Sequence, residues 1–170
     1  FRGHLDRISD NLLLGGVNAF REGLIGSGKN QLTGRVESYP NIARDYKSKG
    51  LRWVIVGDSN YGEGSSREHA AMTPRYLGCA AVIARSFARI HETNLKKQGL
   101  LALTFENPAD YDRIKEDDLL NISGIAEMQQ GADPDEVAIF YNEGDNTWEK
   151  QVISTGGCHS MVVFDADEDG

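Results

Sequence analysis

The sequence predicts an α/β domain, in which a small, mostly parallel central sheet is flanked by helices and followed by a β-rich C-terminal part. Between residues 40 and 105, short apolar segments alternate with helix-forming segments, and this order implies parallel strands joined by right-handed crossovers. From residue 119 onward, segments of strand character follow one another with turn residues between them. The length of 170 residues fits a single domain with a buried core.

The N-terminal part is expected to be mainly irregular. Residues 1–16 have a loop-like pattern that is compatible with a short helical turn or an extended segment. Residues 17–39 are polar, rich in glycine and without periodicity, so we expect a long surface loop. A helix is expected to begin at Pro40 and to stop at Gly50, because these residue types are favoured at those helix positions.

The central strands are expected at three apolar segments, residues 51–56, 80–84 and 100–105. The helix Arg67–Leu77 contains Pro74, which predicts a kink or a split. A second helix, Phe87–Gln98, carries lysines in its last turn, where cations suit the helix dipole. A helical turn and three strands are then predicted at 110–114, 119–124, 136–141 and 147–153, with the last two strands forming a hairpin, and 154–170 is expected to be a flexible tail.

Composition excludes several classes of function. The net charge of −8 argues against nucleic acid as the main partner, because phosphate binding requires a basic face. No apolar run is long enough to span a bilayer. Cys79 and Cys158 are far apart in the sequence, which favours free thiols over a disulfide. His, Cys, Asp and Glu residues do not recur at the spacing of zinc ligands, so a metal site within the chain is not expected. The absence of an initiator Met leads us to expect a piece of something longer.

The segment from Gly57 to Ala71 (GDSNYGEGSSREHAA) joins the first central strand to a helix through a glycine-rich loop. Backbone N–H groups and the helix dipole favour an anion at such a turn, and Arg67 suits a carboxylate. On spacing alone, the commoner interpretation is that Ser65 or Ser66 is a helix N-cap and Arg67 a surface residue. The loop matches neither dinucleotide nor P-loop motifs, which disfavours a nucleotide, and it is not a hydrolase elbow.

This segment closely resembles the C-terminal swivel domain of mitochondrial-type aconitases. The resemblance continues through Ser86–Leu101 (SFARIHETNLKKQGLL) and Leu103–Tyr111 (LTFENPADY), and the start, residues 1–6, also fits. It is dense over residues 1–124 and looser beyond, where the strand character remains but the family's residues do not. The resemblance implies one swivelling β/β/α-type domain, residues 1–170, of a hydro-lyase that isomerises citrate and isocitrate through cis-aconitate.

The resemblance also implies roles for individual residues. Ser65 corresponds to the general base that removes a proton from substrate carbon, and Ser66, Arg67 and Arg2 correspond to ligands of the substrate carboxylates. A serine needs positive surroundings to act as a base, which agrees with the anion site inferred from the loop. The 4Fe–4S cluster of the family is held by cysteines of other domains, and neither cysteine of this chain lies in the matching motifs.

The implied partners are therefore the cluster-bearing domains 1–3 of aconitase and a tricarboxylate substrate, in the mitochondrial matrix. We expect the chain alone to be inactive. Two alternatives remain open: a small subunit or domain of a related isopropylmalate or homoaconitate hydratase, and a non-catalytic binding or regulatory domain. The roles of His69, Cys79 and Cys158 are not assigned, and His91 is expected at a helix surface or a domain contact.

Overall fold

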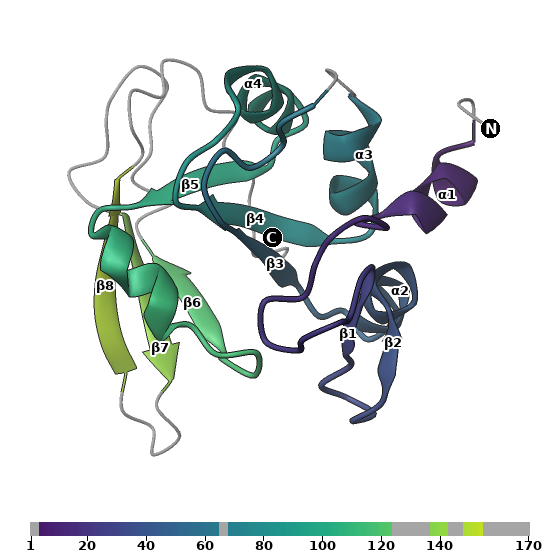
Figure 1. The fold of residues 1–170 in the computed structure, drawn as a ribbon, viewed down its shortest axis with the longest axis horizontal. Helices are drawn as coiled ribbons and strands as arrows, with labels where there is room; N and C mark the ends of the chain where they lie inside the picture. The colour runs from purple at the N-terminus through teal and green to yellow at the C-terminus, as the bar shows by residue number, and fades with distance from the viewer. Residues whose placement is uncertain (1–3, 65–67, 124–136, 143–147, 155–170) are drawn as a thin grey trace, which may run out of the picture.

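The computed structural model describes residues 4–64, 68–123, 137–142 and 148–154 (Figure 1). In chain order the elements are α1 (Leu5–Ile8), the 3-10 helix η1 (Ser9–Asn11), β1 (Ser27–Lys29), β2 (Val36–Ser38), α2 (Tyr39–Ser48), β3 (Trp53–Gly57), α3 (His69–Tyr76), β4 (Cys79–Ala84), α4 (Arg89–Lys97), β5 (Leu101–Phe105), the 3-10 helix η2 (Pro108–Arg113), β6 (Leu120–Ser123), β7 (Val137–Asn142) and β8 (Trp148–Ser154). The predicted α/β class is confirmed.

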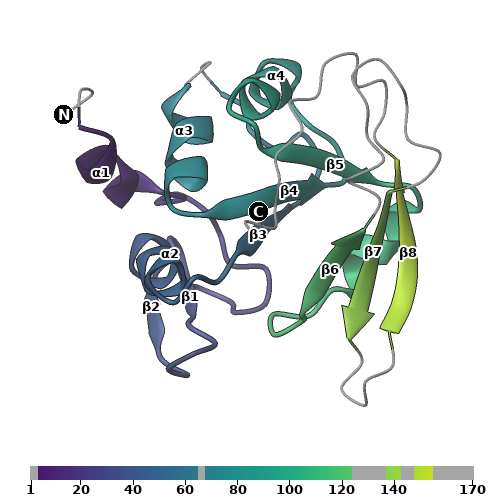
Figure 2. The ribbon, with the colours of Figure 1, turned by 180° about the vertical axis from the view of Figure 1, so that it is seen from behind.

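The main sheet has the strand order β3-β4-β5-β8-β7-β6. Strands β3, β4 and β5 are parallel, as their crossover helices require, and β6, β7 and β8 are antiparallel. The two halves join where Thr104 pairs with Ser154 and Phe105 with Ile153. Figures 1 and 2 show β6–β8 grouped at one end of the parallel part, and the predicted β7–β8 hairpin pairing is confirmed.

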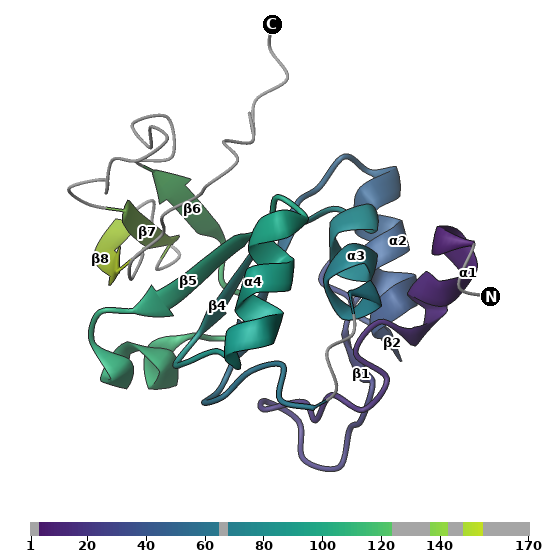
Figure 3. The same cartoon turned by 90° about the horizontal axis from the view of Figure 1, so that it is seen from above.

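Both faces of the parallel sheet are covered. On one face, Ala71 of α3 and Leu95 of α4 pack with Val82 of β4, and Figure 3 shows the two helices side by side. On the other face, Ile83 and Leu103 pack with Ile114, which follows η2. Burial on both faces explains why β4 is an almost continuous apolar run rather than an alternating one.

The structure corrects one local prediction and excludes one alternative of another. The expected loop at 17–39 contains the antiparallel pair β1–β2, and α2 begins at its last residue, Tyr39. Pro74 lies inside a single helix, α3, which is not split there. Pro74 has no N–H to donate to the carbonyl of Ala70, but its side chain is fully buried, and this packing offsets the lost hydrogen bond.

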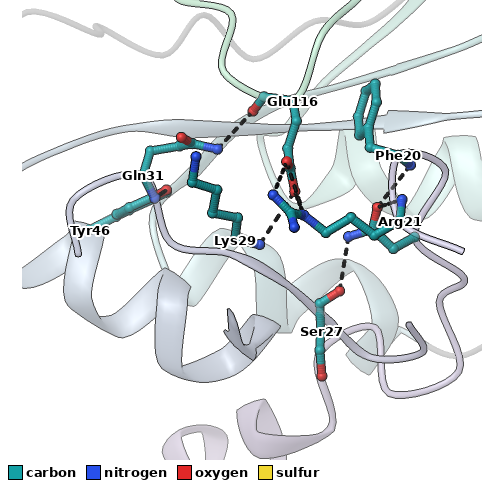
Figure 4. A network of polar contacts seen from close by, with 8 residues as sticks. Phe20, Arg21, Ser27, Lys29, Gln31, Tyr46 and Glu116 are labelled. Carbon is teal, nitrogen blue, oxygen red and sulfur yellow. Dashed lines mark hydrogen bonds and ion pairs between the residues drawn. The ribbon is translucent and has the colours of Figure 1, made fainter. Parts of the chain in front are cut away.

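Residues 17–39, called the β1–β2 region below, are attached by hydrogen bonds to the segment that precedes β6 (Figure 4). Arg21 forms an ion pair with Glu116, the backbone N–H of Lys29 donates to the same carboxylate, and Gln31 donates to the backbone carbonyl of Glu116. Glu116 thus binds three residues of a region that has little regular structure. Within the parts of the chain that the structure describes, no helix is both long and apolar enough to cross a membrane.

Candidate functional site

The candidate site is at the edge of the sheet where the parallel strands end. Strand β3 ends at Gly57, which pairs with Ala84, the last residue of β4. The segment 58–64, called the glycine loop below, leaves from Gly57, and residues 85–88 leave from Ala84 beside it. Ligands of α/β domains bind outside the carboxyl ends of such strands, so the glycine loop is at the edge where a ligand is expected.

Backbone hydrogen bonds fix the glycine loop to the segment after β4. The N–H of Tyr61 donates to the carbonyl of Ser86 (2.9 Å), and the N–H of Ala88 donates to the carbonyl of Tyr61 (2.9 Å). The N–H of Asn60 donates to the hydroxyl of Ser86 at 2.7 Å. Asn60 has a φ of 56°, a left-handed conformation that asparagine tolerates better than most residues. The loop is therefore held in one conformation by its neighbour.

Aromatic side chains close the space beneath the glycine loop. The ring of Tyr61 makes edge contacts with Phe87 (6.1 Å between centroids) and with His91 (5.3 Å). A Cβ atom at Gly57 would come within 2.5 Å of the Tyr61 ring, so the ring needs a glycine at the end of β3. Burial raises the pKa of the Tyr61 hydroxyl, which keeps it neutral. Through these contacts, Tyr61 packs the glycine loop against Gly57, Phe87 and His91.

His91 is buried, with 8% of its surface exposed, which corrects the expectation that it lies on the helix surface; the alternative of a domain contact stays a prediction. It is the third residue of α4 and packs against Tyr61 and Gly62 inside the domain. Burial lowers the pKa of its imidazole, because desolvation penalises the charged form.

Arg85 is a cation that contacts the start of the glycine loop. Its guanidinium contacts Asp58 (3.5 Å) and Asp112 (2.9 Å) and stacks over the ring of Tyr111 (4.4 Å). Because two carboxylates of the chain already surround it, Arg85 orders the strand ends. Sequence reasoning missed this residue, although its place directly after a parallel strand was a usable signal.

The four predicted site residues, Arg2, Ser65, Ser66 and Arg67, lie outside the described residues, and only their flanks are placed. The glycine loop ends at Gly64, and α3 begins at His69 after Glu68, whose side chain makes no capping hydrogen bond. The chain before Leu5 leads into α1, which packs against α3. The segment containing Arg2 and the segment 65–67 therefore adjoin two helices that are in contact.

The described residues do not fit an iron–sulfur cluster or another metal. Among them, no group of three or more His, Cys, Asp and Glu side chains could hold a metal ion. Cys79 is fully buried, its sulfur lies 3.3 Å from the carbonyl oxygen of Ala81, and burial raises its pKa to about 12. Clusters need several thiolates, and the whole chain has two cysteines, of which Cys158 lies outside the described ranges.

Comparison with known proteins gives matches over most of the chain. The family model described as the aconitase C-terminal domain matches residues 1–108. The probable mitochondrial aconitate hydratase of Dictyostelium discoideum is 56% identical over 131 residues, which are 77% of this chain and 17% of the relative. The mitochondrial aconitate hydratase of Schizosaccharomyces pombe is 50% identical over 166 residues, or 98% of this chain and 21% of the relative. The chain thus spans about a fifth or less of these relatives' length.

Among solved structures, the 3-isopropylmalate dehydratase of Methanocaldococcus jannaschii is similar to this chain. It is 30% identical in sequence and has a TM-score of 0.45, with 66% of this chain and 60% of that chain covered. The similarity to the Schizosaccharomyces pombe relative, at 166 residues, extends beyond the first 124 residues of this chain.

Proposed function

Because the chain belongs to the aconitase C-terminal domain family, we propose that it supplies one wall of a hydro-lyase site that interconverts citrate and isocitrate through cis-aconitate. The observation that carries the proposal is the segment Gly57–Ala71, whose loop is fixed at the carboxyl edge of the parallel sheet. Relatives that share this region are named aconitate hydratases, and the fungal and slime-mould relatives are named as mitochondrial enzymes.

In the proposed reaction, Ser65 takes the proton from the substrate carbon, and Ser66, Arg67 and Arg2 bind carboxylates. A serine alkoxide needs nearby positive charge, and two arginines with the N-terminus of α3 would provide it. The contact between α1 and α3 supports this arrangement, because Arg2 is two residues from the described residue His4, before α1, and Arg67 is next to the described residue Glu68, before α3. Three substrate carboxylates also suit two bidentate guanidinium groups.

The 4Fe–4S cluster of the family is assigned to other domains, because the thiols of this chain do not fit it. The cluster-bearing domains and the tricarboxylate are the proposed partners, and the mitochondrial matrix is the proposed location. The purified 170-residue chain by itself is accordingly expected not to hydrate cis-aconitate.

Substrate competition tests the proposed function. In the cluster-loaded enzyme that contains this chain, cis-aconitate should be hydrated, and isopropylmalate and homoaconitate should be turned over at least about 100-fold less efficiently, because the groups that recognise the far end of the substrate are left unpaired. Preference for either of the other two acids would assign the chain to a related hydratase. Salt-dependent RNA binding without any turnover would instead identify a regulatory domain.

A further inference from the structure

Gly62 lies so close to His91 that there is no room for a side chain at position 62. A Cβ atom built on Gly62 would overlap Cγ, Cδ2 and Cβ of His91. Gly62 also has a φ of 84°, in the left-handed region that favours glycine. The close approach to His91 and the positive φ therefore each require glycine at position 62. The backbone of Gly62 lies directly against the imidazole.

His91 is itself held firmly. It lies in the first turn of α4, a helix whose Leu95 is fully buried in the core between helices and sheet. The ring of Tyr61 also makes an edge contact with the imidazole, and the backbone of Tyr61 is hydrogen-bonded to Ser86 and Ala88. The imidazole is thus a fixed surface built from α4 and the segment after β4.

Gly62 lies three residues before Ser65, and Glu68 begins the next described segment. A chain of three residues spans at most about 11 Å, so the position of Gly62 limits the region that Ser65 can occupy. Reacting groups displaced by about 1 Å can lose about 100-fold in rate. Through Gly62, the position of the imidazole therefore bears on the proposed reaction.

We propose that His91 is a positioning residue for this hydro-lyase: its ring seats Gly62 and so fixes where the chain enters Ser65. The expected effect of His91 on the reaction rests on the proposed function. Its expected effect on the position of the glycine loop rests on the contact with Gly62. Neither the family motif nor the sequence reasoning assigned His91 a role.

The test uses the cluster-loaded enzyme that contains this chain, with His91→Ala, His91→Phe, Gly62→Ala and the double variant Gly62→Ala/His91→Ala. For His91→Ala, kcat should fall about 10- to 100-fold because Ser65 is displaced, and KM should change by a smaller factor because Arg2, on a separate segment, still binds a carboxylate. His91→Phe keeps a ring in place and should retain most of kcat. The double variant should be less impaired than the product of the two single effects, because the space vacated by the imidazole accepts the new methyl group.

Leu95→Ala is the matched control for lost packing on α4, since Leu95 belongs to the buried cluster against which Tyr61 also packs, whereas the atoms nearest to Gly62 are those of His91. Its kcat per folded molecule should stay close to that of the wild type. If His91→Ala lowers kcat no more than Leu95→Ala, if His91→Phe is as impaired as His91→Ala, or if the two substitutions at positions 62 and 91 act independently, the inference is wrong.

A second measurement separates this inference from the proposed function. Hydrogen exchange of the peptide covering residues 58–64, measured in the same full enzyme, should be faster in His91→Ala than in Leu95→Ala or the wild type. Equal exchange in all three would overturn the positioning role, whatever Ser65 does. An active Ser65→Ala enzyme would instead refute the role of Ser65 as the base in the proposed function, and faster exchange would still show that His91 seats the loop.

Discussion

Arg21 and Glu116, which are 95 residues apart in the sequence, are joined by three hydrogen bonds. The Nε of Arg21 donates to both carboxylate oxygens (2.9 and 3.1 Å), and the Nη2 donates to Oε2 (3.0 Å). This side-on pair is the main connection between the β1–β2 region and the segment before β6 (Figure 4).

We predict that Glu116→Gln lowers the melting temperature near pH 7 and that this difference from the wild type disappears in acid. Hydrogen bonds from Arg21, opposed in part by burial, hold the pKa of Glu116 below its ordinary value. A carboxyl whose pKa is lowered by folding stabilises the protein above its unfolded pKa, and this contribution is lost as the pH falls through its folded pKa. Glu92→Gln, which removes the local pair with Lys96 in α4, should have a smaller effect at pH 7. A constant difference between pH 7 and pH 3 would contradict this explanation.

Cys79 should be unreactive in the folded protein. Its side chain is fully buried and its pKa is raised to about 12, so almost no thiolate is present at pH 8. Peptide-resolved mass spectrometry after brief maleimide treatment should show Cys79 unmodified in the native protein and modified after unfolding in guanidinium. Rapid labelling of Cys79 under native conditions would show that the core between α3, α4 and the sheet opens readily.

Ser86→Ala should loosen the glycine loop, because the N–H of Asn60 loses its hydroxyl acceptor. The loss in free energy of unfolding should be about 0.5–1.5 kcal/mol, and kcat of the full enzyme should fall more than KM changes. Thr93→Ala also removes a hydroxyl that hydrogen-bonds to backbone, on α4, and should leave kcat unchanged. Equal kcat values for the two variants would show that the Ser86 contact does not affect the reaction.

Local patterns predicted the parallel sheet well, because its strands are apolar on both faces and its helices end at glycines. The pair β1–β2 was missed, since strands of three residues in a glycine-rich segment are too short to show a period. The junction of β5 with β8 was also beyond the sequence pattern, because Phe105 and Ile153 meet only through the tertiary fold.

The sequence likewise predicted one part of the candidate site and missed another. The glycine loop was predicted, because the strand, the glycines and the following helix are consecutive in the sequence. Its support by Ser86 and His91 was not, because the alignment of Gly57 with Ala84 depends on the register of two parallel strands. The roles of Arg2, Ser65, Ser66 and Arg67 remain predictions.

The kcat of Ser65→Ala in the cluster-loaded enzyme tests the central claim most directly. Cis-aconitate hydration is measured beside the wild type and beside Ser48→Ala, a control on α2 whose hydroxyl bonds to the carbonyl of Asp45. If Ser65 is the base, kcat falls about 10²- to 10⁴-fold in Ser65→Ala with the cluster content unchanged, and Ser48→Ala is unaffected. A Ser65→Ala enzyme as active as the wild type would contradict the assignment.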